Sequence, residues 1–143
     1  MFFTFWYNKG RVSVSIACFS RDERIDVEYL IAGAKDLGIR LQPHHLDAFR
    51  AYQEILIEWN QRFNLTAITD DVGVQIRHFL DSLSCLKALE EEDRLSGRRV
   101  IDVGTGAGFP GVPLKIPCPG IQLTLLDARA KKTRFLKHLV DAL

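Results

Sequence analysis

A glycine-rich turn after a short apolar stretch most constrains what this chain can fold into. The sequence there reads Val100-Ile101-Asp102-Val103-Gly104-Thr105-Gly106-Ala107-Gly108-Phe109-Pro110-Gly111. The apolar start predicts a strand, the glycines permit a sharp turn close to a ligand, and the proline suits the first turn of a helix. A second strand is expected at residues 121–126. It ends at Asp127, about 20 residues after the glycines, where a carboxylate can accept both hydrogens of a ribose diol. This order predicts an α/β fold with a nucleotide-like cofactor at the turn.

Two kinds of cofactor fit this turn. Read from Gly106, the sequence matches the G-x-G-x-x-G of dinucleotide-binding enzymes, which is a weak signal by itself. Read from Gly104, it is D-x-G-x-G-x-G, with Asp102 two residues before the first glycine. A carboxylate there would repel a diphosphate, whereas S-adenosylmethionine carries an ammonium and a sulfonium and no phosphate. The residues therefore favour S-adenosylmethionine over a nicotinamide dinucleotide, and a purely structural turn is the third interpretation.

Composition excludes several classes of protein. With 143 residues, 47% hydrophobic and 26% charged, the chain has the composition of one globular domain. A net charge of +1 gives no overall attraction for a polyanion, so any contact with nucleic acid must come from local clusters. Cys18, Cys85 and Cys118 lie far apart, which argues against a disulfide framework and a zinc site and fits a reducing cytoplasm. No apolar run approaches the roughly 20 residues that span a membrane.

The first 97 residues are predicted to be mainly helical. Residues 1–24 begin with crowded aromatic side chains and are interpreted as a loosely held leader rather than a signal peptide. Apolar residues at helical spacing predict a helix at about 27–37 and a longer one at 43–62. The charged stretch 90–99 is the expected connector. We therefore divide the chain into a leader (1–24), a helical region (25–97) and the first part of a nucleotide-binding domain (98–143).

Two helical segments are expected between the long helix and the connector. Asp70 or Asp71 could cap the first, which runs towards His78, and Asp81 leads into the second. His78 and Asp81 lie three residues apart, so on a helix they would share a face and could pair. Such a pair could serve a functional site or act as a structural brace.

The last segment combines an apolar helix face with a cluster of basic residues. Pro117 and Pro119 must end the helix that follows the glycine turn. The basic cluster beyond Asp127 consists of Arg129, Lys131, Lys132, Arg134 and Lys137. A charge run of this kind is usually a solvated face, and the alternative is contact with RNA phosphates near the cofactor.

Four separated stretches carry a resemblance to a known family. They are Trp59–Ile68 (WNQRFNLTAI), Arg77–Leu83 (RHFLDSL), Val100–Gly111, and Leu125-Leu126-Asp127 with Lys131-Lys132 and Phe135-Leu136. From about residue 25 to 143 the chain resembles the glucose-inhibited division protein B family of small-subunit ribosomal RNA guanine-N7 methyltransferases. The resemblance implies a helical region packed on a class I S-adenosylmethionine-dependent methyltransferase sheet, which is Rossmann-like and here incomplete. Roughly the last third of the family's length would be absent, so the apolar faces of residues 100–143 are expected to lack partners.

The resemblance also implies a set of site residues. The cofactor would be lined by Gly104, Gly106, Gly108 and Phe109, with Asp102 near its methionine end and Asp127 on its ribose. Ala128-Arg129 stands where members often have a serine after the acid, so the local turn is expected to differ.

The implied reaction is S-adenosylmethionine-dependent methylation of guanine N7 in ribosomal RNA. Because the N7 lone pair is unprotonated at neutral pH, the chemistry needs no general base, and His78 and Asp81 become candidates for orienting the base. The partner would be ribosomal RNA or the small ribosomal subunit, and a cytoplasmic protein, monomeric at full length and without a metal, is expected. A dinucleotide-dependent oxidoreductase and a truncated, non-catalytic chain remain the alternatives.

Overall fold

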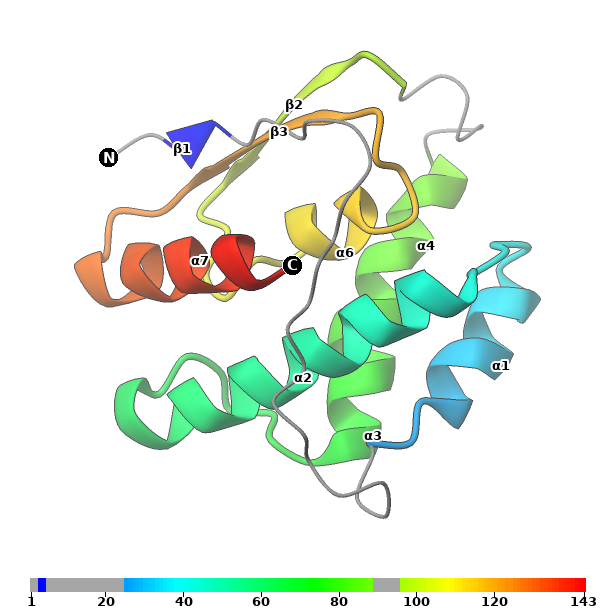
Figure 1. Ribbon diagram of the computed structural model, residues 1–143, viewed down its shortest axis with the longest axis horizontal. Helices are drawn as coiled ribbons and strands as arrows, with labels where there is room; N and C mark the ends of the chain where they lie inside the picture. Colours follow the sequence, from blue (N-terminus) through cyan, green and yellow to red (C-terminus); the bar gives the residue numbers. More distant parts are fainter. Residues whose placement is uncertain (1–2, 5–24, 89–95) are drawn as a thin grey trace.

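The computed structural model describes residues 3–4, 25–88 and 96–143, and from residue 99 onward its strands and helices alternate as expected for an α/β protein (Figure 1). The helices are α1 (Glu28–Asp36), α2 (Pro43–Phe63), α3 (Asp71–Gly73), the π-helix η1 (Val74–Leu80), α4 (Asp81–Ala88), α6 (Gly111–Lys115) and α7 (Ala130–Ala142). The strands are β1 (Phe3–Thr4), β2 (Arg99–Val103) and β3 (Gln122–Leu126). The leader, apart from β1, and most of the predicted connector lie outside the described residues.

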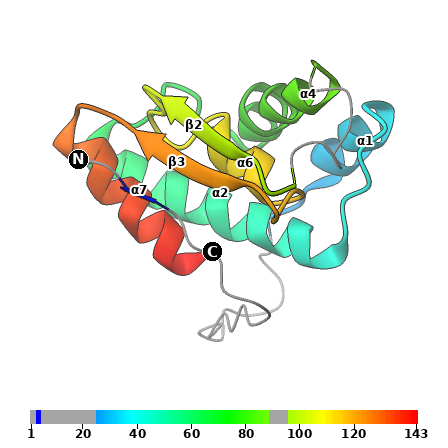
Figure 2. The same ribbon diagram turned by 90° about the horizontal axis from the view of Figure 1, so that it is seen from above.

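The sheet has the strand order β1-β3-β2. Strands β2 and β3 are parallel, with Val103 paired to Leu126, whereas β1 pairs antiparallel to β3. Figure 2 shows β2 and β3 ending at the same edge of the sheet. Because Val103 is paired to Leu126, the glycine turn after β2 and Asp127 after β3 are neighbours at that edge. The Gly104 amide donates to the Leu126 carbonyl at 2.7 Å, which extends the ladder into the turn. The predicted α/β alternation is therefore confirmed.

The two predicted N-terminal helices are present as α1 and α2. Helix α2 begins after Gln42, whose side chain and His45 form a reciprocal cap, and Pro43 occupies its first turn. It ends where Asn64 adopts φ +45°, a left-handed conformation that asparagine tolerates. Local sequence signals thus define both ends of this helix.

The two separate helices expected over residues 70–89 are one continuous helical run, which corrects that prediction. Asp70 caps the run by accepting a hydrogen bond from the Gly73 amide at 2.7 Å, and α3, η1 and α4 then follow without a break. The π-helical segment buries the adjacent residues Val74 and Gln75 together with Phe79. Gln75 accepts from the Leu30 amide and donates to the Asp26 carbonyl, so the wide turn ties this run to the start of α1. The π-helical segment continues the helix across the boundary that we expected between His78 and Asp81. Apolar spacing in the sequence does not predict such a segment.

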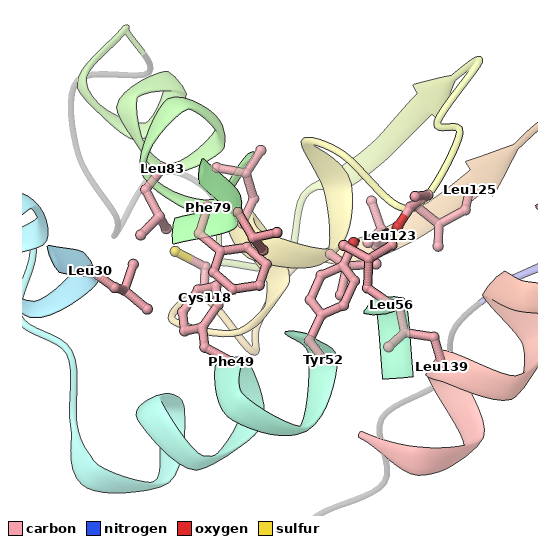
Figure 3. Close-up of a cluster of buried hydrophobic side chains, with 14 of the residues drawn as sticks. Leu30, Phe49, Tyr52, Leu56, Phe79, Leu83, Cys118, Leu123, Leu125 and Leu139 are labelled. Carbon is pink, nitrogen blue, oxygen red and sulfur yellow. Dashed lines mark hydrogen bonds between the residues drawn. The ribbon is translucent and has the colours of Figure 1, made fainter. Parts of the chain in front are cut away.

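One hydrophobic cluster joins the helical region to the sheet region (Figure 3). Figure 1 shows α6 and α7 on one side of the strands, with α2 beyond them. The cluster includes Leu30, Phe49, Tyr52, Leu56, Phe79 and Leu83 from the helices and Cys118, Leu123, Leu125, Phe135 and Leu139 from the sheet region. The expectation that the apolar faces of residues 100–143 lack partners is therefore wrong for α7 and the inner face of β3. It holds for the outer face of β2, where Ile101 and Val103 are 57% and 70% exposed.

Over residues 25–88 and 96–143, no helix has the length and apolar character that crossing a bilayer requires. In the same ranges, no three histidine, cysteine, aspartate or glutamate side chains gather closely enough to hold a metal ion.

Candidate functional site

The turn between β2 and α6 is braced by Asp102. The Oδ2 atom of this carboxylate accepts hydrogen bonds from the Thr105 hydroxyl at 2.7 Å and from the Gly111 amide at 2.9 Å. The Thr105 carbonyl accepts from the Gly108 and Phe109 amides, which closes the turn. Asp102 therefore lies where the sequence predicts it, at the end of β2, and its contacts fix both ends of the turn.

Asp127 lies against the middle of the same turn. Its Oδ2 accepts from the Gly106 amide at 3.0 Å, although the two residues come from different strand ends. The side chain is buried, and burial by itself would raise the pKa of the carboxyl, but hydrogen bonds from Arg129 and from the Gly106 amide together hold that pKa below its usual value. The structure thus brings together the glycine turn and Asp127, the acid that the sequence places at the end of the second strand.

Two glycines of the turn have different surroundings. Gly106 has φ +63°, and a side chain there would point into open space, with the nearest atom, the Gly104 carbonyl oxygen, 3.8 Å away. Gly108 has φ +100°, and a Cβ atom there would lie 2.6 Å from the Tyr52 hydroxyl oxygen and 3.0 Å from Val112. The backbone at Gly106 is open to a ligand, whereas Gly108 packs against the protein.

Phe109 lies between two aromatic rings of the helical region. His78 stacks on it with ring centroids 4.3 Å apart, and Tyr52 stacks on it at 5.4 Å. The Tyr52 hydroxyl donates a 2.5 Å hydrogen bond to the Ala107 carbonyl, and burial, together with the charge of Asp102, raises the pKa of Tyr52 well above its usual value. In the sequence, Tyr52 is one of the residues whose helical spacing predicts the helix at 43–62, and nothing else distinguishes it. The signal that could have singled it out is chemical: a buried tyrosine hydroxyl needs a partner.

His78 and Asp81 do not form the pair that their spacing allows. The His78 Nε2 atom lies 2.8 Å from the Thr66 hydroxyl oxygen, and no hydrogen bond links the His78 ring to the Asp81 carboxylate. Asp81 instead lines a groove of about 650 Å³ beside α1, together with Asp36 and Arg77. Burial lowers the pKa of His78 and outweighs the opposing effects of the Asp81 charge and the Arg77 backbone, so the ring is neutral at pH 7.

Two members of the basic cluster donate hydrogen bonds to backbone carbonyls near the end of α2. Lys131 donates to the Phe63 carbonyl at 2.8 Å, and the buried Lys132 donates to the Leu65 carbonyl. Phe63 is the last residue of α2, where a helix carries partial negative charge, and Leu65 follows two residues later. Arg129, Arg134 and Lys137 are exposed. Lys132 therefore does not belong to a solvated face, which is the usual place of such a charge run.

The lowered pKa values of His45 and His78 predict loss of stability in mild acid. The pKa of His45 is lowered by burial and by the nearby His44, and its Nδ1 accepts a hydrogen bond from the Gln42 amide at 3.1 Å. Below the ordinary value of 6.5, the unfolded chain binds protons that the folded chain does not, so the free energy of unfolding falls as the pH falls. Urea unfolding at about pH 7.5 and pH 5.5 measures the difference. In the double variant His45→Gln/His78→Gln, the free energy of unfolding should differ less between the two pH values. An unchanged pH dependence in that variant would show that these two histidines do not cause it.

Known proteins match most of this chain. The sequence model of the GidB family, described as rRNA small subunit methyltransferase G, matches residues 45–143. A protein named ribosomal RNA small subunit methyltransferase G from Caldanaerobacter subterraneus subsp. tengcongensis is 51% identical over 117 residues, which cover 82% of this chain and 48% of that protein. Proteins of the same name from Thermoanaerobacter sp. and Leuconostoc citreum are 50% and 46% identical, with the same two coverages.

The chain spans about half the length of these relatives. The match begins within the helical region and continues through the glycine turn, β3 and α7. On this similarity, the chain belongs to the GidB family of rRNA small subunit methyltransferase G proteins.

Proposed function

We propose that this chain supplies the first part of a class I S-adenosylmethionine-dependent methyltransferase that methylates a guanine N7 in small-subunit ribosomal RNA. The observation that carries the proposal is the contact between the Gly106 amide and the Asp127 carboxylate at the ends of two parallel strands. In open α/β sheets, ligands bind outside the carboxyl ends of the strands, and this contact puts an acid and an accessible backbone at that edge. Family membership supports the same reading.

The residues at the edge suit S-adenosylmethionine. Open space at Gly106 allows the cofactor to approach the backbone, Asp127 offers a carboxylate to the ribose hydroxyls, and Asp102 contributes negative charge near the methionine end. Gly104 completes the open side of the turn, while Gly108 and Phe109 support it from behind. The Asp102 carboxylate beside the turn favours a cationic, phosphate-free cofactor over a dinucleotide.

When bound, S-adenosylmethionine supplies an electrophilic methyl group. The contribution of the protein is to hold guanine N7 in line with the bond that breaks and to exclude water, which can lower the barrier by several kcal/mol. His78 is the candidate for orienting the base because its ring stacks on Phe109, next to the glycine turn, and burial lowers its pKa. Asp81 would act from the neighbouring groove, and exposed Arg134 and Lys137 of α7 offer positive charge to RNA phosphates.

Thermal unfolding with and without ligand tests the proposal. S-adenosylhomocysteine should raise the midpoint temperature for unfolding of this chain, whereas NAD should leave that temperature unchanged. A ligand that binds the folded chain stabilises it, and one that does not bind has no effect. Protection by NAD alone would select the oxidoreductase alternative. Protection by neither ligand would select the non-catalytic alternative for this chain.

Replacement of Asp127 by alanine should weaken the binding of S-adenosylhomocysteine by roughly 1–3 kcal/mol, the scale for loss of a charged hydrogen-bond acceptor. Asp127→Asn should lose less, since one acceptor oxygen remains. Asp141→Ala removes the same charge from an exposed position on α7 and serves as the matched control. Calorimetric titration measures the affinities, and equal loss in the Asp127 and Asp141 variants would show that the ribose assignment is wrong.

A further inference from the structure

The carboxylate of Asp127 accepts four hydrogen bonds. Its Oδ1 accepts from the Arg129 amide at 2.9 Å and from Arg129 Nε at 3.2 Å. Its Oδ2 accepts from the Gly106 amide at 3.0 Å and from an Arg129 terminal nitrogen at 3.3 Å. Two donors are backbone amides, and the other two belong to one guanidinium group.

An ionised carboxylate has about four acceptor positions, so that of Asp127 is saturated. The backbone amides are held by the turn after β3 and by the glycine turn, and they cannot leave without rearrangement of the site. The guanidinium differs, because the Arg129 side chain is 61% exposed and extends from the protein surface to a carboxylate that is 3% exposed. It can therefore swing into solvent without disturbing the core.

We infer that the Arg129 side chain occupies the two acceptor positions that a ribose diol would use, so that the cofactor must displace it in order to bind. This inference rests on the proposed function, which assigns Asp127 to the ribose. A diol donates two O–H groups, which matches the two positions held by the guanidinium. A forked guanidinium–carboxylate contact is also stronger than hydrogen bonds from neutral hydroxyls, so displacement opposes binding. Arg129 is thus a residue that sets cofactor affinity.

The test compares variants that keep or remove the fork. Arg129→Gln should bind S-adenosylhomocysteine about 2- to 10-fold more tightly than the parent chain, the range expected for loss of a competing, partly exposed ion pair. Arg129→Lys keeps the charge but not the fork, so its affinity should lie between the two. Arg40→Gln, at an exposed arginine between α1 and α2, changes net charge equally and should leave the affinity unchanged. Calorimetric titration measures all four proteins.

Ionic strength and NMR provide independent readouts. Added salt screens the exposed guanidinium, so the parent chain should gain affinity with salt relative to Arg129→Gln. The Nε–H signal of Arg129 should be protected from exchange in the free chain and lose that protection when S-adenosylhomocysteine is added. If the parent chain binds and Arg129→Gln binds equally or more weakly, the competition is refuted while the cofactor site stands. If neither protein binds, the proposed function of this chain fails, and the competition fails with it.

Discussion

Replacement of Gly108 by alanine is expected to lower the free energy of unfolding by about 2–6 kcal/mol, from backbone strain and overpacking together. The backbone at this position has φ +100°, which side-chain-bearing residues rarely adopt. The added Cβ would also lie 2.6 Å from the Tyr52 hydroxyl oxygen, closer than real atoms pack. Tyr52 is fully buried and cannot retreat without breaking its hydrogen bond to the Ala107 carbonyl. Urea denaturation measures the loss.

Gly106→Ala is the matched control for that variant. Gly106 also has a positive φ, of +63°, but its Cβ would point into open space. Only the conformational penalty of about 1–2 kcal/mol should remain. Equal destabilisation by the two alanines would show that contact with Tyr52 contributes nothing, and that the turn does not depend on the helical region.

Replacement of Gly106 by valine is expected to reduce affinity for S-adenosylhomocysteine more than about 100-fold, equivalent to roughly 3 kcal/mol. The branched side chain would fill the open space through which the proposed cofactor reaches the backbone. The variant should keep its helical content, since the atom nearest to the added Cβ, the Gly104 carbonyl oxygen, is 3.8 Å away. Calorimetric titration measures the affinity, and circular dichroism checks the helical content.

Gly38→Val separates lost binding from general strain. Gly38 has φ +77° with no atom within 4 Å of its Cβ position, and it follows α1, away from the turn. This variant should carry a similar conformational penalty and bind normally. If Gly106→Val binds as tightly as Gly38→Val, the cofactor does not pass over this turn.

The elements predicted correctly are those defined by local signals. The ends of α2 depend on Pro43 and Asn64, and the meeting of the glycine turn with Asp127 follows from two short parallel strands in sequence. The π-turn in η1 escaped prediction because no residue type marks it. We expected separate helices there because we assumed α-helical spacing, and the side chains of a π-helical segment do not follow that spacing.

The sequence patterns did not predict contacts between distant parts of the chain. Gly106 and Gly108 are the same residue type in the same turn, yet Tyr52 of α2, with Val112 and Leu136, makes only Gly108 a packing residue. Likewise, Lys132 belongs to a basic run, and nothing local indicates that its ammonium group reaches the Leu65 carbonyl. The candidate site was thus found from spacing, whereas its support by the helical region required the structure.

The shared core has a consequence for the order in which the chain folds during synthesis. Helix α2 leaves the ribosome well before α7, yet Trp59 of α2 packs on Phe135 and His138 of α7, with ring centroids 5.8 and 5.1 Å apart. Until α7 emerges, that side of α2 has no partner from the sheet region. The helices therefore cannot complete their packing as an independent early unit, and until α7 emerges the nascent chain exposes an aromatic surface of the kind that promotes aggregation.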